Sequence, residues 1–95
     1  MANNYLIDYM EKIKQELPKW FNGELYSEGG TVKNPYSGEE YELTAEELSM
    51  YDFIKGAEMC IGMGMYVSSK IQEDFDKGLR WFIKNNPKAY MTLLD

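Results

Sequence analysis

Histidine is absent from this sequence of 95 residues, and cysteine occurs once, at position 60. Histidine is the residue that enzymes use most often as a general acid or base, and a nucleophilic thiol or hydroxyl needs a base beside it. The sequence also lacks a phosphate-binding glycine-rich loop and a serine nucleophile motif. We therefore expect a protein that is not an enzyme.

Long apolar segments are absent as well. No apolar run approaches the roughly 20 residues that a membrane-spanning helix requires, and Met1 to Tyr5 lack the basic charge that opens a signal peptide. The single cysteine excludes a disulfide within the chain and is typical of a reducing compartment. These absences predict a cytoplasmic protein with no membrane partner.

Positive charge is scarce, with 10 lysines and arginines against 16 acidic residues and a formal net charge of -6. The whole excess of negative charge falls between residues 24 and 47, because acids and bases balance on either side of this segment. Such a localised field repels the phosphate backbone of nucleic acids and attracts basic surfaces, so we expect no nucleic-acid binding. The acids of the segment, which face only Lys33, are Glu24, Glu28, Glu39, Glu40, Glu42, Glu46 and Glu47.

Core-forming residues are plentiful, since 44% of the sequence is hydrophobic and 15% is aromatic. A chain of this length can bury one modest core, so we expect a single domain over residues 1–95. Apolar residues recur at the three- and four-residue steps of an amphipathic helix in residues 4–17, 44–61 and 69–85, and again briefly from residue 87. Between residues 23 and 43 this pattern is interrupted.

The interrupted segment predicts a β-hairpin with strands at Thr31 to Asn34 and Glu40 to Leu43. Pro35-Tyr-Ser-Gly38 joins them, because the proline fixes the entry of a turn and the glycine supplies a positive φ near its exit. Glu24 to Ser27 is a candidate third strand. The expected fold class is α+β, mainly α: three to four helices packed around one core, with a small antiparallel β-hairpin inserted between the first and second helices.

Several short motifs mark the ends of the predicted helices. Thr44-Ala-Glu-Glu47 has the spacing of a capping box, and Gly62-Met-Gly64 ends the helix that it starts. Ser68 or Ser69 is expected to cap the third helix, and Asn86 followed by Pro87 to start the last one. Gly78 suggests a close helix crossing. The expected core consists of Tyr9, Ile13, Leu17, Phe53, Ile54, Ala57, Ile61, Ile71, Phe75, Leu79 and Phe82.

Two places in the sequence hold residues of the types that bind metal ions. Met59-Cys-Ile-Gly-Met-Gly-Met65 holds soft sulfur ligands that suit Cu(I), but methionine and cysteine are also ordinary packing residues, and we favour a helix end that packs on its neighbours. Glu73, Asp74 and Asp76 lack the spacing of a calcium loop and are expected on a solvated helix face. We predict no metal site and no cofactor.

Three strings of the sequence carry a resemblance to known proteins. They are Asn34-Pro-Tyr-Ser-Gly-Glu39, Glu47-Leu-Ser-Met-Tyr-Asp-Phe-Ile54 and Lys77-Gly-Leu-Arg-Trp-Phe-Ile-Lys-Asn-Asn-Pro-Lys-Ala-Tyr-Met-Thr-Leu-Leu-Asp95. With them the chain resembles a family of small uncharacterised proteins from tailed phages of marine cyanobacteria. The resemblance implies synthesis in the cytoplasm of an infected host cell and favours binding to a host or phage protein, and it brings no activity or site with it.

The acidic segment leads to two hypotheses about function. In the first, the protein is a non-catalytic interaction module that meets a basic protein partner through the 34–47 region, unless these acids serve only to keep the surface soluble. In the second, it is a structural homo-oligomer, such as a homodimer, in which the apolar Met59 to Val67 region pairs with its copy. The residues predicted to bind the partner are Tyr36, Glu39, Glu40, Tyr41, Glu42, Glu46 and Glu47.

Overall fold

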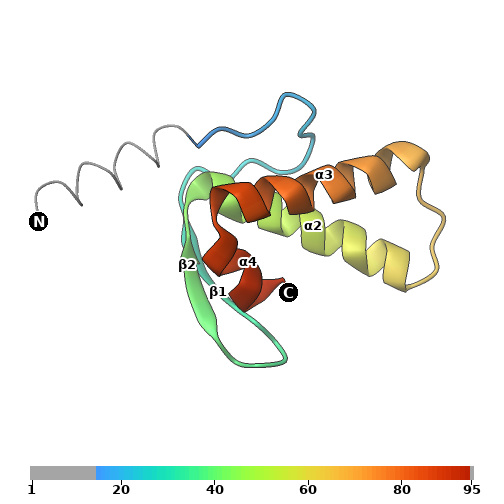
Figure 1. Cartoon of the computed structure of the whole chain (residues 1–95). Helices are drawn as coiled ribbons and strands as arrows, with labels where there is room; N and C mark the ends of the chain where they lie inside the picture. The colour runs from blue at the N-terminus through green and yellow to red at the C-terminus, as the bar shows by residue number, and fades with distance from the viewer. Residues whose placement is uncertain (1–14, 95) are drawn as a thin grey trace, which may run out of the picture.

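The structure is a computed structural model that describes residues 15–94, and Figure 1 shows the course of the chain. The fold is α+β and mainly α, as predicted, with three helices and one two-stranded antiparallel sheet in the described residues. None of these helices is long and apolar enough to cross a membrane. The elements in chain order are β1 (Gly30–Lys33), β2 (Glu40–Leu43), α2 (Ala45–Gly62), α3 (Ser69–Asn85) and α4 (Pro87–Leu93).

The predicted first helix, residues 4–17, lies largely outside the described residues. Its predicted end at Leu17 is wrong, because residues 15–18 are not helical. Pro18 accounts for this, since the ring of a proline disfavours helical geometry at the preceding residue. The chain instead turns at Lys19 and Trp20, where the Phe21 amide donates to the Pro18 carbonyl at 3.0 Å.

The predicted hairpin is present, with β2 at the predicted residues and β1 shifted by one residue toward the N-terminus. Its register pairs Gly30 with Leu43 and Lys33 with Glu40. The third strand expected at residues 24–27 does not form. The Tyr26 amide donates instead to the Ser49 hydroxyl of α2 at 2.9 Å, so this segment is tied to a helix rather than to the sheet.

The helix-capping signals predicted between residues 44 and 87 are confirmed. Thr44 caps α2 with both hydrogen bonds of the capping box, and Gly64 takes a φ of 72° just after the helix ends. Ser68 is the residue that caps α3, through its hydroxyl and the Ile71 amide. Asn86 caps α4, with Pro87 in its first turn. Local side-chain chemistry therefore sets these boundaries.

The helices α2 and α3 form an antiparallel pair, and the sheet and α4 pack at the end of the pair where α2 begins and α3 ends (Figure 1). Gly78 allows α3 to approach α2 closely, as predicted. A Cβ at Gly78 would lie 3.1 Å from Met50 Sδ and 3.3 Å from Ile54 Cγ1. The loop that joins α2 to α3 lies at the opposite, uncovered end of the pair.

The core lies where the sheet and α4 cover the helix pair. Its buried members are Leu43, Met50, Ile54, Phe82, Ala89 and Leu93. Among the residues predicted for the core, Ile54, Ala57 and Phe82 are buried, and Leu17, Phe53, Phe75 and Leu79 pack partly buried against the cluster.

Two residues predicted for the core are not part of it. Ile61 is 41% exposed and Ile71 40% exposed, so both predictions are wrong. They lie near the loop that joins α2 to α3, at the end of the pair that neither the sheet nor α4 covers. Tyr9 and Ile13, also predicted for the core, lie outside the described residues.

The segment before the hairpin packs on α2 through aromatic rings. The ring centroid of Phe53 lies 6.0 Å from that of Trp20 and 5.8 Å from that of Phe21, in tilted and edge-to-face arrangements. Such geometries place the positive edge of one ring near the negative face of another. These contacts hold residues 20 and 21 against the helix that also supports the hairpin.

One acid of α3 is not where the sequence placed it. Asp74 was expected on the solvated face with Glu73 and Asp76, but it is 6% exposed. It lies one turn before Gly78, on the side of α3 that includes the close crossing with α2. Lys70 Nζ, one turn earlier, donates to Asp74 Oδ2 at 2.9 Å, so the buried carboxylate has a charged partner.

Candidate functional site

The turn of the hairpin is organised by the side chain of Asn34. Its Oδ1 accepts hydrogen bonds from the amides of Tyr36 at 2.8 Å and Ser37 at 3.3 Å. The Asn34 backbone closes the loop, because its N–H donates to the Glu39 carbonyl at 2.8 Å and its carbonyl accepts from Gly38 at 2.9 Å. Gly38 has a φ of 80°, a conformation that other residues adopt with strain. The turn is therefore fixed by its own hydrogen bonds.

The same asparagine ties the hairpin to the body of the protein. Its Nδ2 donates to the Thr92 carbonyl at the end of α4, at 2.9 Å. The inner face of the hairpin carries the half-buried Val32 and Tyr41 and the buried Leu43, which pack on the core cluster. The turn is thus held both internally and against α4.

Tyr36 lies at the tip of this turn and is 94% exposed. Large aromatic side chains are usually mostly buried, because leaving their apolar surface in water is unfavourable. Nothing in the folding of the hairpin uses this ring, since the turn is closed by Asn34 and Gly38. The ring of Tyr36 is therefore exposed and takes no part in closing the turn.

The outer face of the hairpin presents the predicted acids. Side chains alternate along a strand, so Glu40 and Glu42 point away from the core together with Thr31 and Lys33 of β1. Glu39 precedes them and is also exposed. Among residues 15–94, the ion pairs are Lys55–Glu58 and Lys70–Asp74, so none involves these acids.

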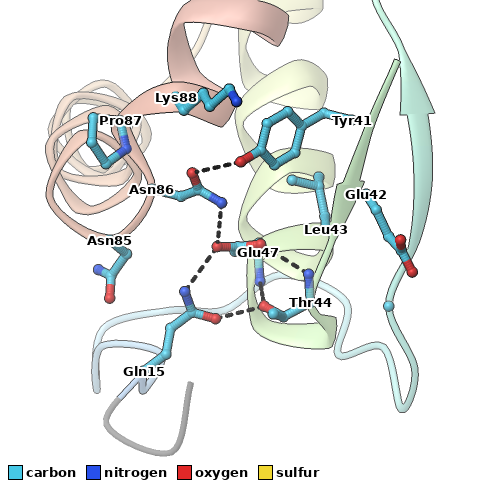
Figure 2. A pocket seen from close by; sticks show the side chains of 11 residues that line it. Gln15, Tyr41, Glu42, Leu43, Thr44, Glu47, Asn85, Asn86, Pro87 and Lys88 are labelled. Carbon is cyan, nitrogen blue, oxygen red and sulfur yellow. Dashed lines mark hydrogen bonds between the residues drawn. The ribbon is translucent and has the colours of Figure 1, made fainter. Parts of the chain in front are cut away.

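Glu47, in contrast, does not belong to this surface. It was predicted to contact a partner, but it is only 3% exposed. Its Oε1 accepts from the Thr44 amide, and its Oε2 accepts from Gln15 Nε2 and Asn86 Nδ2, all at 2.9 Å (Figure 2). Both oxygens of the carboxylate therefore accept hydrogen bonds from within the protein. The helix start therefore accounts for Glu47 without a partner.

Two further predicted residues are only partly available. Tyr41 is half-buried on the inner face of the hairpin, and its hydroxyl donates to Asn86 Oδ1 at 3.4 Å (Figure 2). Glu46 is half-buried in the first turn of α2. Of the residues predicted to bind a partner, the structure brings together on one exposed surface Tyr36, Glu39, Glu40 and Glu42, which we call the hairpin surface.

A cavity of about 700 Å³ lies beside Glu47, between the start of α2 and the junction of α3 with α4 (Figure 2). Polar side chains of its lining bond to one another: Thr44 Oγ1 donates to Gln15 Oε1 at 2.5 Å, and Asn86 Nδ2 donates to Glu47 Oε2 at 2.9 Å. From the sequence, Asn86 was predicted only to cap a helix, and no role was predicted for Gln15. Their link to Glu47 spans 39 and 32 residues of sequence, and no local pattern signals it.

A second hollow, a groove of about 550 Å³, runs between the hairpin turn and α2. Lys55 Nζ donates to Glu58 Oε1 at 3.0 Å within it, and this hydrogen bond raises the pKa of Lys55. The α2 side of the groove was not predicted from the sequence, although Gly56 in mid-helix was a signal for it. The lining residues are Pro35, Tyr36, Asp52, Lys55, Gly56, Glu58 and Met59.

The methionines near the end of α2 do not pack as predicted. Met59, Met63 and Met65 are 65%, 70% and 54% exposed, because no element among the described residues covers this end of the helix pair. Cys60 is half-buried. Within residues 15–94 no group of three or more histidine, cysteine, aspartate and glutamate side chains is placed to hold a metal ion.

Comparison of the chain with protein-family models, with curated proteins and with solved structures found no match.

Proposed function

We propose that this protein is a non-catalytic interaction module that binds the basic surface of a partner protein through its hairpin surface. The observation that carries the proposal is Tyr36, 94% exposed on a turn that is closed by hydrogen bonds and fastened to α4. The exposed acids of the hairpin lie beside it, and none of them forms an ion pair among the described residues. An aromatic anchor next to charges of one sign is an arrangement that binds protein surfaces.

The energetics of association support this role for a fixed turn. Binding costs free energy when loops must become ordered, and a turn that is already held avoids most of this cost. Tyrosine is among the residues that contribute most to binding at protein interfaces. The acids Glu39, Glu40 and Glu42 would add long-range attraction, which raises the association rate with a basic surface and weakens with added salt.

The resemblance to small proteins of cyanobacterial phages supports a setting for this binding. In that setting the protein is made in the cytoplasm of an infected host cell, and its partner is a host or phage protein. A small acidic module that diverts or assembles another protein needs no active site, which agrees with the lack of histidine in the sequence.

The experiment is a capture of partners from host lysate on the immobilised protein, followed by mass spectrometry. We expect Tyr36→Ala and the double variant Glu39→Lys/Glu42→Lys each to lose the proteins that the wild type retains. Glu40 is left unchanged because a lysine there would face Lys33 across the strands. Glu73→Lys/Asp76→Lys on α3 is the matched control, since it makes the same charge change at two exposed residues elsewhere.

The control variant shows whether the hairpin surface or only the net charge of the protein explains the capture. If the α3 variant loses the same proteins as the hairpin variant, bulk charge explains the capture. If all variants retain the same proteins as the wild type, the hairpin surface does not bind them. Either result contradicts the proposal.

A second candidate function, a structural homo-oligomer, is favoured by the uncovered end of the α2–α3 pair. Met63 is 70% exposed there and Tyr66 is 95% exposed, next to the half-exposed Met65 and Ile61. Exposed apolar side chains in contiguous patches mark interaction sites, and a symmetric pair of copies is the commonest way to cover one.

Light scattering tests the oligomer against the monomer mass of 11.1 kDa. The candidate predicts a mass of two chains or more, which Ile61→Lys/Met63→Glu reduces to one while leaving the net charge unchanged. Met91→Glu is the control, because Met91 is 67% exposed on α4, away from this end. A monomer mass for the wild type at high protein concentration would rule the candidate out.

A further inference from the structure

Gly56 is a glycine that the fold itself does not require. It lies in the interior of the 18-residue helix α2, where glycine is less stable than alanine. Its backbone does not have a positive φ, and a Cβ added there would meet nothing within 4 Å. Gly78, by comparison, is needed because a Cβ would press on Met50 and Ile54. The missing side chain at Gly56 instead leaves the floor of the groove beside Tyr36 open.

The lining of the groove combines apolar side chains with three charged ones. Pro35 and Tyr36 form the wall on the turn, and Met59, 65% exposed, forms part of the wall on α2. Lys55 is paired with Glu58, which leaves the exposed Asp52 as the remaining charge of the lining.

More negative charge lies beside Asp52. The Tyr26 amide donates to the hydroxyl of Ser49, one turn of α2 before Asp52, so the segment that holds Glu24 runs beside this part of the helix. Burial and the nearby carboxylates of Asp52 and Glu24 raise the pKa of Tyr26. The lining of the groove therefore has a net negative charge, with two acids against one lysine. An occupant that complements it needs a long apolar stem and a cationic head.

We infer that the groove between the hairpin turn and α2 receives an arginine side chain of the partner protein. The stem of the arginine would lie over Gly56 and against Met59, its planar guanidinium would stack on the ring of Tyr36, and the charge would face Asp52. This inference rests on the proposed function, because it names the chemistry of the partner at the same surface. Arginine fits better than lysine, since the guanidinium is flat, stacks on aromatic rings and is less strongly hydrated.

The experiment uses a random peptide library as the probe. The full-length protein is immobilised, binding peptides are selected, and the strongest are synthesised for affinity measurement by isothermal titration calorimetry. We expect the selected peptides to share an arginine. Replacing that arginine by citrulline, which keeps the shape and removes the charge, should weaken binding about tenfold or more, and replacing it by lysine should weaken it by a smaller factor.

Variants of the protein locate the arginine in the groove. Gly56→Leu fills the floor and should weaken binding about tenfold or more, although the melting temperature should rise because leucine favours a helix. Asp52→Asn should weaken binding about threefold to tenfold. Gly62→Leu is the matched control: Gly62 is also an exposed glycine of α2 with nothing within 4 Å of an added Cβ, but it does not line the groove. It should bind as the wild type does.

The outcomes separate this inference from the function on which it rests. Selected peptides without a shared arginine, or with unchanged affinity for Gly56→Leu and Asp52→Asn, would overturn the groove as the arginine site. The proposed function would survive that result if Tyr36→Ala and Glu39→Lys/Glu42→Lys still weakened binding. If none of these variants changed the affinity, both would be wrong.

Discussion

At the scale of single residues, the clearest case is the buried carboxylate of Glu47. It has no cationic partner among the described residues, and it is held by the Thr44 amide, Gln15 and Asn86 at the start of α2. A buried charge is tolerated when hydrogen bonds replace its hydration, and the partial positive charge of a helix N-terminus contributes further. Glu47 therefore joins three separate parts of the chain.

We predict that Glu47→Ala lowers the free energy of unfolding by about 3 kcal/mol. The variant loses hydrogen bonds to a charged acceptor and leaves the Gln15 and Asn86 amides without their partner. Urea denaturation monitored by circular dichroism measures the change. Glu46→Ala is the control and should cost less than about 0.5 kcal/mol, because the half-buried Glu46 makes no such bonds in the described part of the chain. Equal losses for the two variants would contradict this role of Glu47.

At the scale of elements, the crossing of α2 and α3 depends on Gly78. A Cβ there would approach Met50 and Ile54, which are both fully buried, so their side chains would have to shift. We predict that Gly78→Ala lowers the free energy of unfolding by about 1 kcal/mol, since overpacking in a dense core outweighs the gain in helix propensity. Thermal unfolding measures it. Gly56→Ala is the control and should raise the free energy of unfolding, because a Cβ at Gly56 meets nothing within 4 Å. If Gly78→Ala were also stabilising, the crossing of α2 and α3 would not depend on Gly78.

The docking of the hairpin depends on the two functional groups of the Asn34 side chain. Its Oδ1 holds the turn, and its Nδ2 holds the Thr92 carbonyl of α4. We predict that Asn34→Asp keeps the turn but loosens the hairpin from α4, at a cost of about 1 kcal/mol, and that Asn34→Ala costs more because both sets of bonds are lost. Amide chemical shifts of Tyr36 and Ser37 should stay close to those of the wild type in Asn34→Asp only. If both variants disturbed them equally, the two roles would not be separable.

Element boundaries could be predicted from the sequence because they depend on local chemistry. The Thr44 capping box, the Gly62-Met-Gly64 motif at the end of α2 and the Asn86-Pro87 pair act within four residues of themselves, and all were predicted. Side-chain burial could not be predicted as well. Ile61 and Ile71 continue the apolar faces of their helices, but those faces extend beyond the end that the sheet and α4 cover.

The missing members of the core show the same limit. Four buried residues of the core were not predicted there: Leu43, Met50, Ala89 and Leu93. Met50 lies at the close crossing with Gly78 of α3. The other three belong to β2 and α4, which pack on each other in a long-range contact that no periodicity reports. In the candidate site, the sequence prediction grouped Tyr41 with Glu40 and Glu42, although the alternation of the strand places Tyr41 on the opposite face. The groove and the Gln15 and Asn86 contacts required the folded chain.

At the scale of the whole molecule, stability should fall at alkaline pH. Burial raises the pKa of Tyr51 above 10.0, and the hydrogen bond to Glu58 raises the pKa of Lys55 above 10.5. Folding therefore favours the protonated form of both groups. The unfolded chain releases these protons first, so their contribution is complete below about pH 10 and is lost as the pH rises through the folded pKa values.

We predict a lower free energy of unfolding at about pH 11 than at about pH 8, as measured by urea denaturation. Tyr51→Phe removes one of the two groups and should reduce the difference, because phenylalanine does not ionise. The contribution of Lys55 is smaller, since its pair with Glu58 lies largely in solvent. Stability that stayed constant or rose over this range would contradict the assigned directions.

Asn86 also determines how the molecule opens. It ends α3, begins α4 and connects through its side chain to Glu47 and Tyr41. A helix of seven residues is not stable alone, so α4 should open only together with β2 and the first turn of α2 as one cooperative unit. Amide hydrogen exchange should then be slow at this end and fast in residues 59–68. The turn that carries Tyr36 is tied to this unit by the bond from Asn34 to the Thr92 carbonyl, so its surface should stay formed while the opposite end of the helix pair fluctuates.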